Sequence, residues 1–470
     1  MRKRCAGCRK ENCDGCSLNP GMKIKSVKGA LSFFPEGFQA DKQEGVGIAF
    51  DIGTTTVAGM LWDLKERIPL GTETCVNPQR IVGSDVISRI SYSRRCEENR
   101  IRLQRIIAEK LDELARKLWA ETENTYGAFG RKISKAMVVG NTAMCEILLG
   151  YSLDGLSAAP FHKEYSGFVT QKGCEMGFSF LGEAQITVLP SIDGYVGADA
   201  LSVYTYVKKK DKRKNLLAVD IGTNGEILLL GEEKSYACST AAGPALEGAA
   251  VYQGMGAAPG AIEEVKILGT FPRQDIYCRI IGGGRAKGIC GSGLVDALAV
   301  LRKLKVIDET GCLLSRQEAR KAGVPELIGR RLSTLEEENR ILLTDGEAPV
   351  YLTAGDVRQL QLAKGAVRAG IEILLHKKGI SAKELDHIYL AGAFGSYIKI
   401  DNAVAIGLLP DISRERITHT GNCAGTGAVM ALLSEKIVQD MESYLKEICH
   451  VELAEEKNFQ EYFLEYMGLC

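Results

Sequence analysis

The sequence predicts an α/β protein, because one short hairpin phrase occurs twice and helical and strand patterns alternate between the copies. The first copy is Ala49-Phe50-Asp51-Ile52-Gly53-Thr54-Thr55-Thr56, and the second is Ala218-Val219-Asp220-Ile221-Gly222-Thr223-Asn224-Gly225. Each copy follows one apolar run and leads into another, which is typical of a strand, a tight Gly-Thr turn and a second strand. The segment 97–122 has leucines and isoleucines at helical spacing, which predicts an amphipathic helix.

Each hairpin carries the groups that bind a nucleotide phosphate. An Asp at the end of a strand can hold a divalent cation, usually through water, and a Gly-Thr turn presents N–H groups and hydroxyls to phosphate oxygens. A single copy is equally consistent with an ordinary structural turn. Two copies, each followed by the expected downstream elements, favour two phosphate-binding turns that hold one nucleotide from both sides.

Composition excludes several classes of function. The chain has 470 residues, enough for two or three domains, with 45% hydrophobic and 25% charged residues. Lys+Arg and Asp+Glu both number 59, so the net charge of zero argues against nucleic acid as a main partner. No apolar run has membrane-spanning length, and charged residues and cysteines follow the basic N-terminus, so we expect a cytoplasmic protein.

The chain divides by pattern into a Cys-rich head, a linker and two halves. We expect the head at 1–20, the linker at 21–45, the first half at 46–207, the second half at 215–435 with an insertion at about 247–350, and a C-terminal helix and tail at 436–470. In the first half, strands are expected at Lys135–Gly140 and Thr187–Pro190, and a helix rich in small residues at Asp193–Val207. The run of charges at 208–214 is predicted to be a solvated loop.

The second half has clear helix boundaries. Thr353 with Asp356 predicts a capped start for a helix that runs to about Lys378, and Gly379 closes it. A strand is expected at His387–Leu390. The Gly-rich phrase Gly421–Gly427 then opens a helix that ends near Ser434.

The order of these elements resembles the actin/Hsp70/sugar-kinase (ASKHA) ATPase superfamily. Five segments match its pattern: two phosphate motifs, two connecting helices and an adenosine motif, at Asp51–Thr56, Asp220–Gly225, Ser191–Ala200, Gly421–Ala428 and Leu390–Gly395. The resemblance covers residues 45 to about 435. It implies two ribonuclease-H-like halves with an ATP cleft between them.

Several short segments of the sequence resemble those of one branch of that superfamily, the reductive activators of corrinoid proteins. The phrases that carry this likeness, besides the first hairpin, are Asn77–Gln79, Gly83–Ile90, Gly140–Met144, Cys238–Ala245, Ala257–Ile262, Ile289–Leu294, Gln361–Lys364 and Ala391–Gly395. Members of this family use ATP to pass an electron from an iron–sulfur centre to an inactive Co(II) corrinoid in a methyltransferase system. The likeness therefore implies a corrinoid protein and a low-potential electron donor as partners, and it leaves a homodimer open.

The head departs from the family pattern. Activators of this family often carry an N-terminal ferredoxin-like domain, whereas only about 45 residues precede the first hairpin here. Four cysteines in the head (Cys5, Cys8, Cys13 and Cys16) could wrap one metal centre in its place. The short spacing and the redox function favour a [4Fe–4S] cluster, while structural zinc and a metal-free head stay open.

The resemblance and the motif chemistry give each matched residue an expected role. Asp51 and Asp220 are expected to hold Mg²⁺ and its waters, and Asp193 to orient the attacking water, although a plain helix N-cap explains Asp193 equally well. The turns and Gly-rich segments are expected to contact the nucleotide through Gly53, Thr54, Thr55, Gly222, Thr223, Asn224, Gly392, Ala393, Gly395 and Gly425. Glu247 is expected either on the cleft wall or at the surface. The five histidines show no ligand spacing, which favours surface or packing roles.

Three other functions stay open at this stage. An activator of a 2-hydroxyacyl-CoA dehydratase shares the ATPase fold, but its cluster is held by cysteines near the ATPase core. A small-molecule kinase with a structural zinc head would need an Asp that acts as base toward a hydroxyl, and no such Asp is identified. A non-catalytic nucleotide sensor is disfavoured by the two intact Asp-Ile-Gly-Thr phrases.

Overall fold

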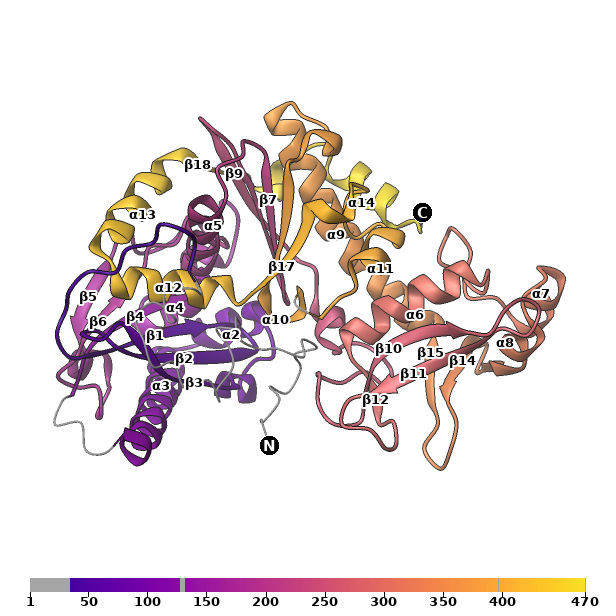
Figure 1. Cartoon of the computed structure of the whole chain (residues 1–470), viewed down its shortest axis with the longest axis horizontal. Coiled ribbons are helices and arrows are strands. Elements are labelled where there is room, and N and C mark those ends of the chain that lie inside the picture. The colour runs from indigo at the N-terminus through magenta and orange to yellow at the C-terminus, as the bar shows by residue number, and fades with distance from the viewer. Residues whose placement is uncertain (1–33, 127–131, 396, 470) are drawn as a thin grey trace. The chain divides into compact units, whose positions relative to one another are not determined.

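The computed structural model describes residues 34–126, 132–395 and 397–469, and they form two compact units (Figure 1). The first unit contains the described residues up to Lys214 together with Leu230–Ala237 and Asn422–His450. The second unit contains the described residues of 215–229, 238–421 and 451–469. The four head cysteines and the linker up to residue 33 lie outside the described residues.

A mixed six-stranded sheet forms the centre of the first unit, with the strand order β3-β2-β1-β4-β6-β5. Its strands are β1 (Val46–Ile52), β2 (Thr56–Asp63), β3 (Ile68–Val76), β4 (Ile133–Gly140), β5 (Val169–Lys172) and β6 (Gln185–Val188). β1 pairs antiparallel with β2, which confirms the first hairpin, and parallel with β4. Six of the seven residues of β1 are buried, as expected for a strand covered on both faces.

Helices cover both faces of this sheet. Figure 1 shows α12 (Cys423–Leu433) above strands β1 and β4 and the long α3 (Glu97–Tyr126) below β2 and β3. The predicted stripe of α3 is buried, since Leu103, Ile107 and Leu111 have no exposed surface. The remaining helices of this unit are α2 (Val86–Ser93), α4 (Thr142–Leu149), α5 (Ala198–Lys210) and α13 (Glu435–Glu447), with short 3-10 turns such as η1 (Pro78–Ile81).

The second hairpin belongs to another six-stranded sheet, ordered β17-β16-β7-β8-β9-β18. Its strands are β7 (Leu216–Ile221), β8 (Gly225–Leu230), β9 (Ser235–Thr240), β16 (His387–Ala391), β17 (Ile417–Gly421) and β18 (Ile448–His450). β16 pairs parallel with β7 and β17, which is the arrangement expected where helices connect the strands.

The predicted helix boundaries in the second unit are confirmed. α9 spans Ala354–Lys378, and Thr353 and Asp356 form a reciprocal capping box at its start. Gly379 ends the helix with φ 72°, a left-handed conformation that glycine adopts readily. α9 packs against α14 (Phe459–Met467), and two short helices, α10 (Gly392–Gly395) and α11 (Ile400–Ala405), follow β16.

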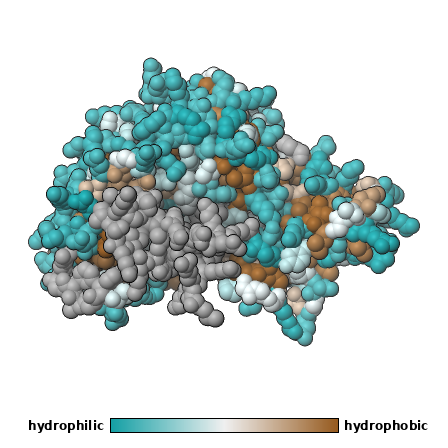
Figure 2. All heavy atoms as spheres, in the orientation of Figure 1, coloured by the Kyte–Doolittle hydropathy of each residue, from teal (hydrophilic) through white to brown (hydrophobic). Residues whose placement is uncertain are grey.

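Two three-stranded sheets occupy most of the segment that was predicted as an insertion. One has the order β11-β10-β12 and the other β13-β14-β15. Their bounds are β10 (Ala261–Leu268), β11 (Asp275–Ile280), β12 (Gly288–Ile289), β13 (Leu332–Leu335), β14 (Glu338–Thr344) and β15 (Val350–Thr353), with helices α6 (Gly291–Lys303), α7 (Arg316–Lys321) and α8 (Glu326–Arg331). Figure 2 shows hydrophobic side chains gathered over the region of β10 and α6, and Leu268 and Phe271 are exposed on the β10–β11 hairpin.

Two local predictions are wrong. The small-residue helix begins at Ala198 rather than Asp193, because Gly197 supplies the extended N-cap and residues 191–197 form a loop. The charge run is not a loop at its start, since Lys208–Lys210 form the last turn of α5. Lys208 pairs with Glu447, and Lys209 pairs with Asp440 at 2.6 Å, so carboxylates of α13 hold this end of the helix.

The stretch after Glu435 is more ordered than a helix and tail. β18 and α14 follow α13, and Lys364 of α9, which is fully buried, donates to the carbonyls of Tyr466 and Gly468 at the end of α14. Among the described residues, no helix combines the length and the hydropathy that crossing a membrane requires.

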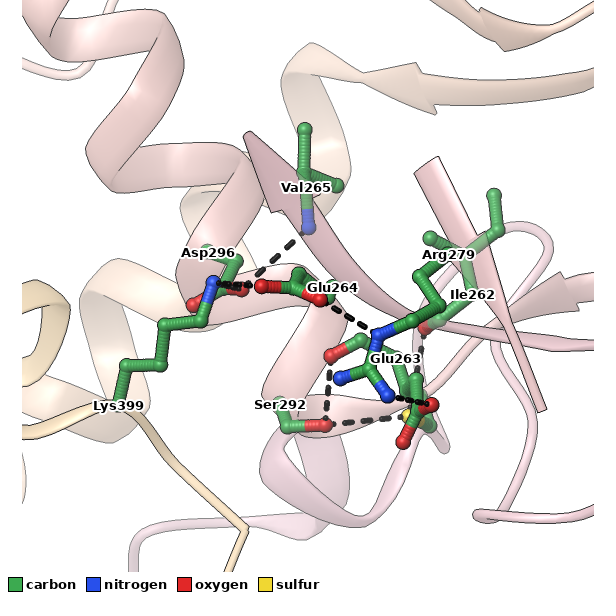
Figure 3. Close-up of polar contacts among 9 residues, drawn as sticks. Ile262, Glu263, Glu264, Val265, Arg279, Ser292, Asp296 and Lys399 are labelled. Atoms are coloured by element: carbon green, nitrogen blue, oxygen red, sulfur yellow. Dashed lines mark hydrogen bonds and ion pairs between the residues drawn. The ribbon is translucent and has the colours of Figure 1, made fainter. Parts of the chain in front are cut away.

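A cluster of charged side chains fastens the segment after α10 to the β10 sheet (Figure 3). Lys399, just before α11, lies 2.7 Å from Glu264 on β10 and 2.8 Å from Asp296 on α6. Arg279 on β11 also pairs with Glu264. Burial alone would raise the pKa of Glu264, but the hydrogen bonds from Lys399 and Arg279 outweigh it and hold that pKa at about 2.

We predict that Lys399→Met destabilises this part of the second unit by about 3 kcal/mol, because Asp296 is 2% exposed and loses its ammonium partner. Hydrogen exchange of peptides from 261–303 measures the local opening free energy. Lys303→Met, at the exposed end of α6, is the matched control and should change it by less than about 0.5 kcal/mol. Equal protection in both variants would show that the cluster contributes nothing to stability.

Candidate functional site

The first phosphate turn, residues 53–55, follows directly from β1. Gly53 N–H donates to the Thr56 carbonyl at 3.0 Å and closes the hairpin. Asp51, one residue before the end of β1, accepts a hydrogen bond from Asn422 Nδ2 at 2.8 Å. Asn422 is the N-cap of α12 and also accepts from Gly425 N–H at 2.6 Å. The first phosphate motif and the second connecting helix, which are distant in sequence, therefore meet at Asp51.

The Asp51 carboxyl is held in an environment that disfavours its charge. Loss of hydration raises its pKa to about 6, and the hydrogen bond from Asn422 only partly opposes that shift. A divalent cation would reverse the effect, because a positive charge stabilises the carboxylate. The position of Asp51 thus fits a metal-binding or metal-orienting role better than a structural one.

Three hydrogen-bond donors from two residues outside the hairpin bind the three carbonyls of the first phosphate turn. Asn77 donates from its backbone N–H to the Thr55 carbonyl and from Nδ2 to the Gly53 carbonyl, both at 2.9 Å. Arg89 Nη2 donates to the Thr54 carbonyl at 2.6 Å. Sequence reasoning placed both residues in family-like phrases but assigned them no role. Because these hydrogen bonds fix all three carbonyls of the turn, they favour one backbone conformation for it.

Asp193 lies in the loop before α5. Thr142 Oγ1 donates to its backbone carbonyl at 2.8 Å, and Thr142 follows the end of β4. Since Gly140 on β4 is paired with Ile52 on β1, the Asp193 loop is attached to the same sheet edge as the first phosphate turn. The N-cap interpretation of Asp193 is wrong, because Gly197 is the N-cap of α5.

A histidine that sequence reasoning left aside holds the Asp193 carboxylate. His450 Nδ1 lies 3.1 Å from Asp193 Oδ2, and Gly194 N–H donates to Oδ1 at 2.9 Å. The hydrogen bond from His450 lowers the pKa of Asp193, so the carboxylate is ionised at neutral pH. Nothing in the sequence signals this pair, because β18 brings His450 to the loop from far along the chain.

The second phosphate turn, residues 222–224, lies in the second unit and is closed one residue earlier than the first. Gly222 N–H donates to the Asn224 carbonyl at 2.9 Å, two residues on, whereas Gly53 N–H donates to the Thr56 carbonyl, three residues on. Thr223 Oγ1 donates to Glu247 Oε2 at 2.9 Å. The Glu247 carboxylate therefore lies at the second phosphate turn.

The adenosine motif meets the second phosphate motif at Gly392. This residue has φ 79°, and a Cβ atom added there would lie 2.2 Å from Asp220 Oδ1. The contact follows from the parallel register, which pairs Ala391 on β16 with Asp220 on β7. Gly395 ends α10, and its carbonyl accepts a hydrogen bond from His419 Nδ1. Ala393 belongs to the same short helix.

The donor chemistry of the two turns fits Mg·ATP. Each turn joins one carboxylate to hydroxyl groups and backbone N–H groups, and Mg²⁺ prefers such oxygen ligands together with phosphates and waters. Over the described residues, no group of three or more His, Cys, Asp or Glu side chains could hold a metal by itself. A cation bound at either turn could take its other ligands from phosphate oxygens and water.

Comparison with known proteins gives a family. The model for the C-terminal ASKHA domain of RACo matches residues 214–470, and the model for the RACo middle region matches residues 46–211. The chain belongs to the RACo family. The family match includes both phosphate turns and the adenosine motif, and it confirms the actin-like ATPase fold that the sequence predicted.

Two curated proteins are similar to this chain over most of its length. The corrinoid activation enzyme RamQ of Eubacterium limosum is 34% identical over 94% of this chain and 73% of its own length. The [Co(II) methylated amine-specific corrinoid protein] reductase of Methanosarcina barkeri is 25% identical over 89% of this chain and 76% of its own. A solved structure, the reductive activator for corrinoid, iron-sulfur protein, is 30% identical with a TM-score of 0.78, covering 92% of this chain and 67% of that one.

We predict that Asp51→Asn stabilises the metal-free protein at pH above about 6 by about 1–2 kcal/mol. The folded-state pKa of about 6 lies above the ordinary value of 3.8, so the wild type loses stability as pH rises through that window. Urea unfolding in EDTA at about pH 4 and pH 8 measures the effect, which should be several-fold smaller at the lower pH, close to the ordinary pKa.

Asp85→Asn is the matched control for that measurement. Burial raises the pKa of Asp85, but hydrogen bonds from Ser88 and Ser84 outweigh it and lower the pKa overall. Its replacement should therefore cause a loss of stability that is larger at the higher pH. The account of Asp51 fails if Asp51→Asn shows the same sign as Asp85→Asn.

We predict that Gly392→Ala reduces ATP affinity at least about tenfold, because its Cβ atom would collide with the Asp220 carboxylate and strain a left-handed backbone. Gly329→Ala, on a helix with open space at the Cβ position, should bind ATP as the wild type does. Isothermal titration with Mg·ATP tests both variants. An unchanged ATP affinity of Gly392→Ala would show that the position of Asp220 does not contribute to nucleotide binding.

Proposed function

We propose that this protein is an ATP-dependent reductive activator that converts a Co(II) corrinoid protein to its Co(I) form. The observation that carries the proposal is the match to the RACo models over residues 46–211 and 214–470. Relatives that cover most of the chain are named as a corrinoid activation enzyme and a Co(II) corrinoid protein reductase. The two phosphate turns supply the ATP-binding half of that function.

ATP is bound by the two phosphate turns and the adenosine motif in this proposal. Asp51 and Asp220 hold Mg²⁺ and its waters, and the hydroxyls of Thr54, Thr55 and Thr223 contact phosphate oxygens. Phosphoryl transfer to water depends mainly on positioning and charge neutralisation, which these groups can provide. Gly392 and Gly395 offer backbone without a side chain to the adenosine.

Asp193 orients the water that attacks the γ-phosphorus. Its carboxylate is ionised at neutral pH and partly exposed, so it can accept a hydrogen bond from water. His450 occupies the other side of the carboxylate and limits its rotation. This assignment predicts that Asp193→Asn lowers kcat strongly and changes nucleotide affinity little, since an amide still fits the loop.

The head cysteines Cys5, Cys8, Cys13 and Cys16 hold a [4Fe–4S] cluster in this proposal. The cluster supplies a single low-potential electron, which it receives from a reduced donor protein. Differential affinity for the corrinoid protein in the ATP-bound and ATP-free states supplies the energy of the uphill step. The proposal therefore requires that nucleotide and corrinoid protein influence each other's binding.

The experiment mixes the purified protein anaerobically with candidate Co(II) corrinoid proteins, ATP and a low-potential reductant. Cobalt absorbance should show Co(I) only when ATP is present, and the corrinoid protein should stimulate ATP hydrolysis. Asp193→Asn should slow both by about 100-fold or more, and Lys303→Met on the exposed end of α6 should behave as the wild type. Failure of every corrinoid protein to yield Co(I), with ATP hydrolysis unaffected by them, contradicts the proposal.

The visible spectrum of the anaerobic protein separates the remaining interpretations of the head. Iron–sulfur absorption that disappears in Cys8→Ser and Cys13→Ser supports the cluster. A colourless protein with bound zinc would instead favour a kinase or a sensor with a structural head.

A further inference from the structure

Arg89 is a charged side chain in the interior of the first unit. It projects from α2, and none of its surface is exposed. Taking a guanidinium out of water is unfavourable unless a counter-charge compensates it. A buried arginine at this position therefore needs an explanation.

Each described partner of the Arg89 guanidinium is neutral. Nε donates to the Gly83 carbonyl at 3.0 Å, Nη1 to Gln79 Oε1 at 3.3 Å and to Met144 Sδ at 3.0 Å, and Nη2 to the Thr54 carbonyl at 2.6 Å. Within the part of the chain that the structure describes, no carboxylate forms an ion pair with it. The nearest acidic influence is Asp85, whose oxygens accept from Ser88 and Ser84.

Another buried cation of the same protein shows the usual solution. Lys364, also without exposed surface, donates to the carbonyls of Tyr466 and Gly468 at the C-terminal end of α14. A helix C-terminus carries a partial negative charge that compensates an ammonium. Two of the four Arg89 acceptors are loop carbonyls rather than a helix end, so its charge stays largely uncompensated.

The shortest hydrogen bond of Arg89 is made to the first phosphate turn. The Thr54 carbonyl points at the guanidinium, and a trans peptide directs the following N–H the opposite way. Thr55 N–H is therefore directed away from Arg89. The arginine thus fixes the direction of one N–H in the turn and places a full positive charge one hydrogen bond behind it.

We propose that Arg89 is the counter-charge of the nucleotide polyphosphate and a positioning residue for the first phosphate turn. This inference rests on the proposed ATP-binding function and deepens it. The polyphosphate supplies the negative charge that the described protein partners of Arg89 lack. The attraction acts through the Thr54–Thr55 peptide and grows with the number of phosphate charges, whereas a residue that only packs would affect all nucleotides alike.

Titration of the full-length protein with Mg·ATP, Mg·ADP and AMP tests the proposal. Arg89→Gln should weaken ATP about 30-fold or more, ADP less, and AMP by no more than about twofold, because a low-dielectric charge interaction scales with ligand charge. Arg89→Lys keeps the charge and should retain ATP affinity to within about fivefold. Arg80→Gln removes a neighbouring but exposed charge and should change nothing.

A second pair of variants avoids removing the arginine from the core. Met144→Glu places a carboxylate where the thioether sulfur now accepts from Arg89, and Met144→Gln has the same shape without the charge. Met144→Glu should weaken ATP at least about tenfold relative to Met144→Gln, with AMP equal in both. This comparison holds even if Arg89→Gln does not fold.

Four outcomes overturn the inference. Equal losses for ATP, ADP and AMP would make Arg89 a packing residue, and equal ATP affinity in Met144→Glu and Met144→Gln would remove the charge from the argument. Wild-type protein that binds no ATP would overturn both this inference and the proposed function. Wild-type binding with unaffected variants would overturn the inference alone.

Discussion

Parallel strand pairing at the ends of two hairpin strands decides where the reactive groups of this protein lie. In the second unit, pairing of β7 with β16 sets Asp220 beside Ala391, so its carboxylate occupies the space that a Cβ atom at Gly392 would need. In the first unit, pairing of β1 with β4 sets Ile52 beside Gly140, and the Asp193 loop is bonded to the helix that follows. Carboxyl ends of neighbouring parallel strands meet at one sheet edge, so residues distant in sequence converge there.

The first phosphate turn combines groups that are unfavourable without a ligand. Asp51 has a raised pKa, and Arg89 is buried beside neutral acceptors. Asp51 accepts a hydrogen bond from the N-cap of α12, and Arg89 donates to a carbonyl of the turn itself. Such arrangements lower the stability of the free protein and are typical of sites that are completed by a charged ligand. The opposite signs of the two charges match a cation and a polyanion bound together.

The sequence predicted those parts of the fold that local chemistry specifies. Thr353, Asp356 and Gly379 delimit α9 because capping groups act within a few residues, and the Gly-Thr turns select hairpins in the same way. The extension of α5 to Lys210 and the role of Lys208 could not be predicted, because the acidic partner comes from α13. The helix continues where its charges are paired across the fold rather than solvated.

The candidate site shows the same division. Asp51, Asp220 and the turn residues were found from the repeated phrase, whereas Asn422, His450 and Arg89 act through contacts with segments far away in the chain. No spacing rule reveals a histidine that strand β18 brings to a loop before α5. The resemblance to corrinoid activators supplied the function, and the RACo match supports it.

The central claim is that ATP drives reduction of a corrinoid protein by this chain. An anaerobic single-turnover experiment that records phosphate release and Co(I) absorbance in the same mixture tests it most directly. The account predicts that Co(I) forms only in mixtures that contain ATP. Co(I) that forms equally fast without nucleotide, from the same protein and reductant, would contradict it.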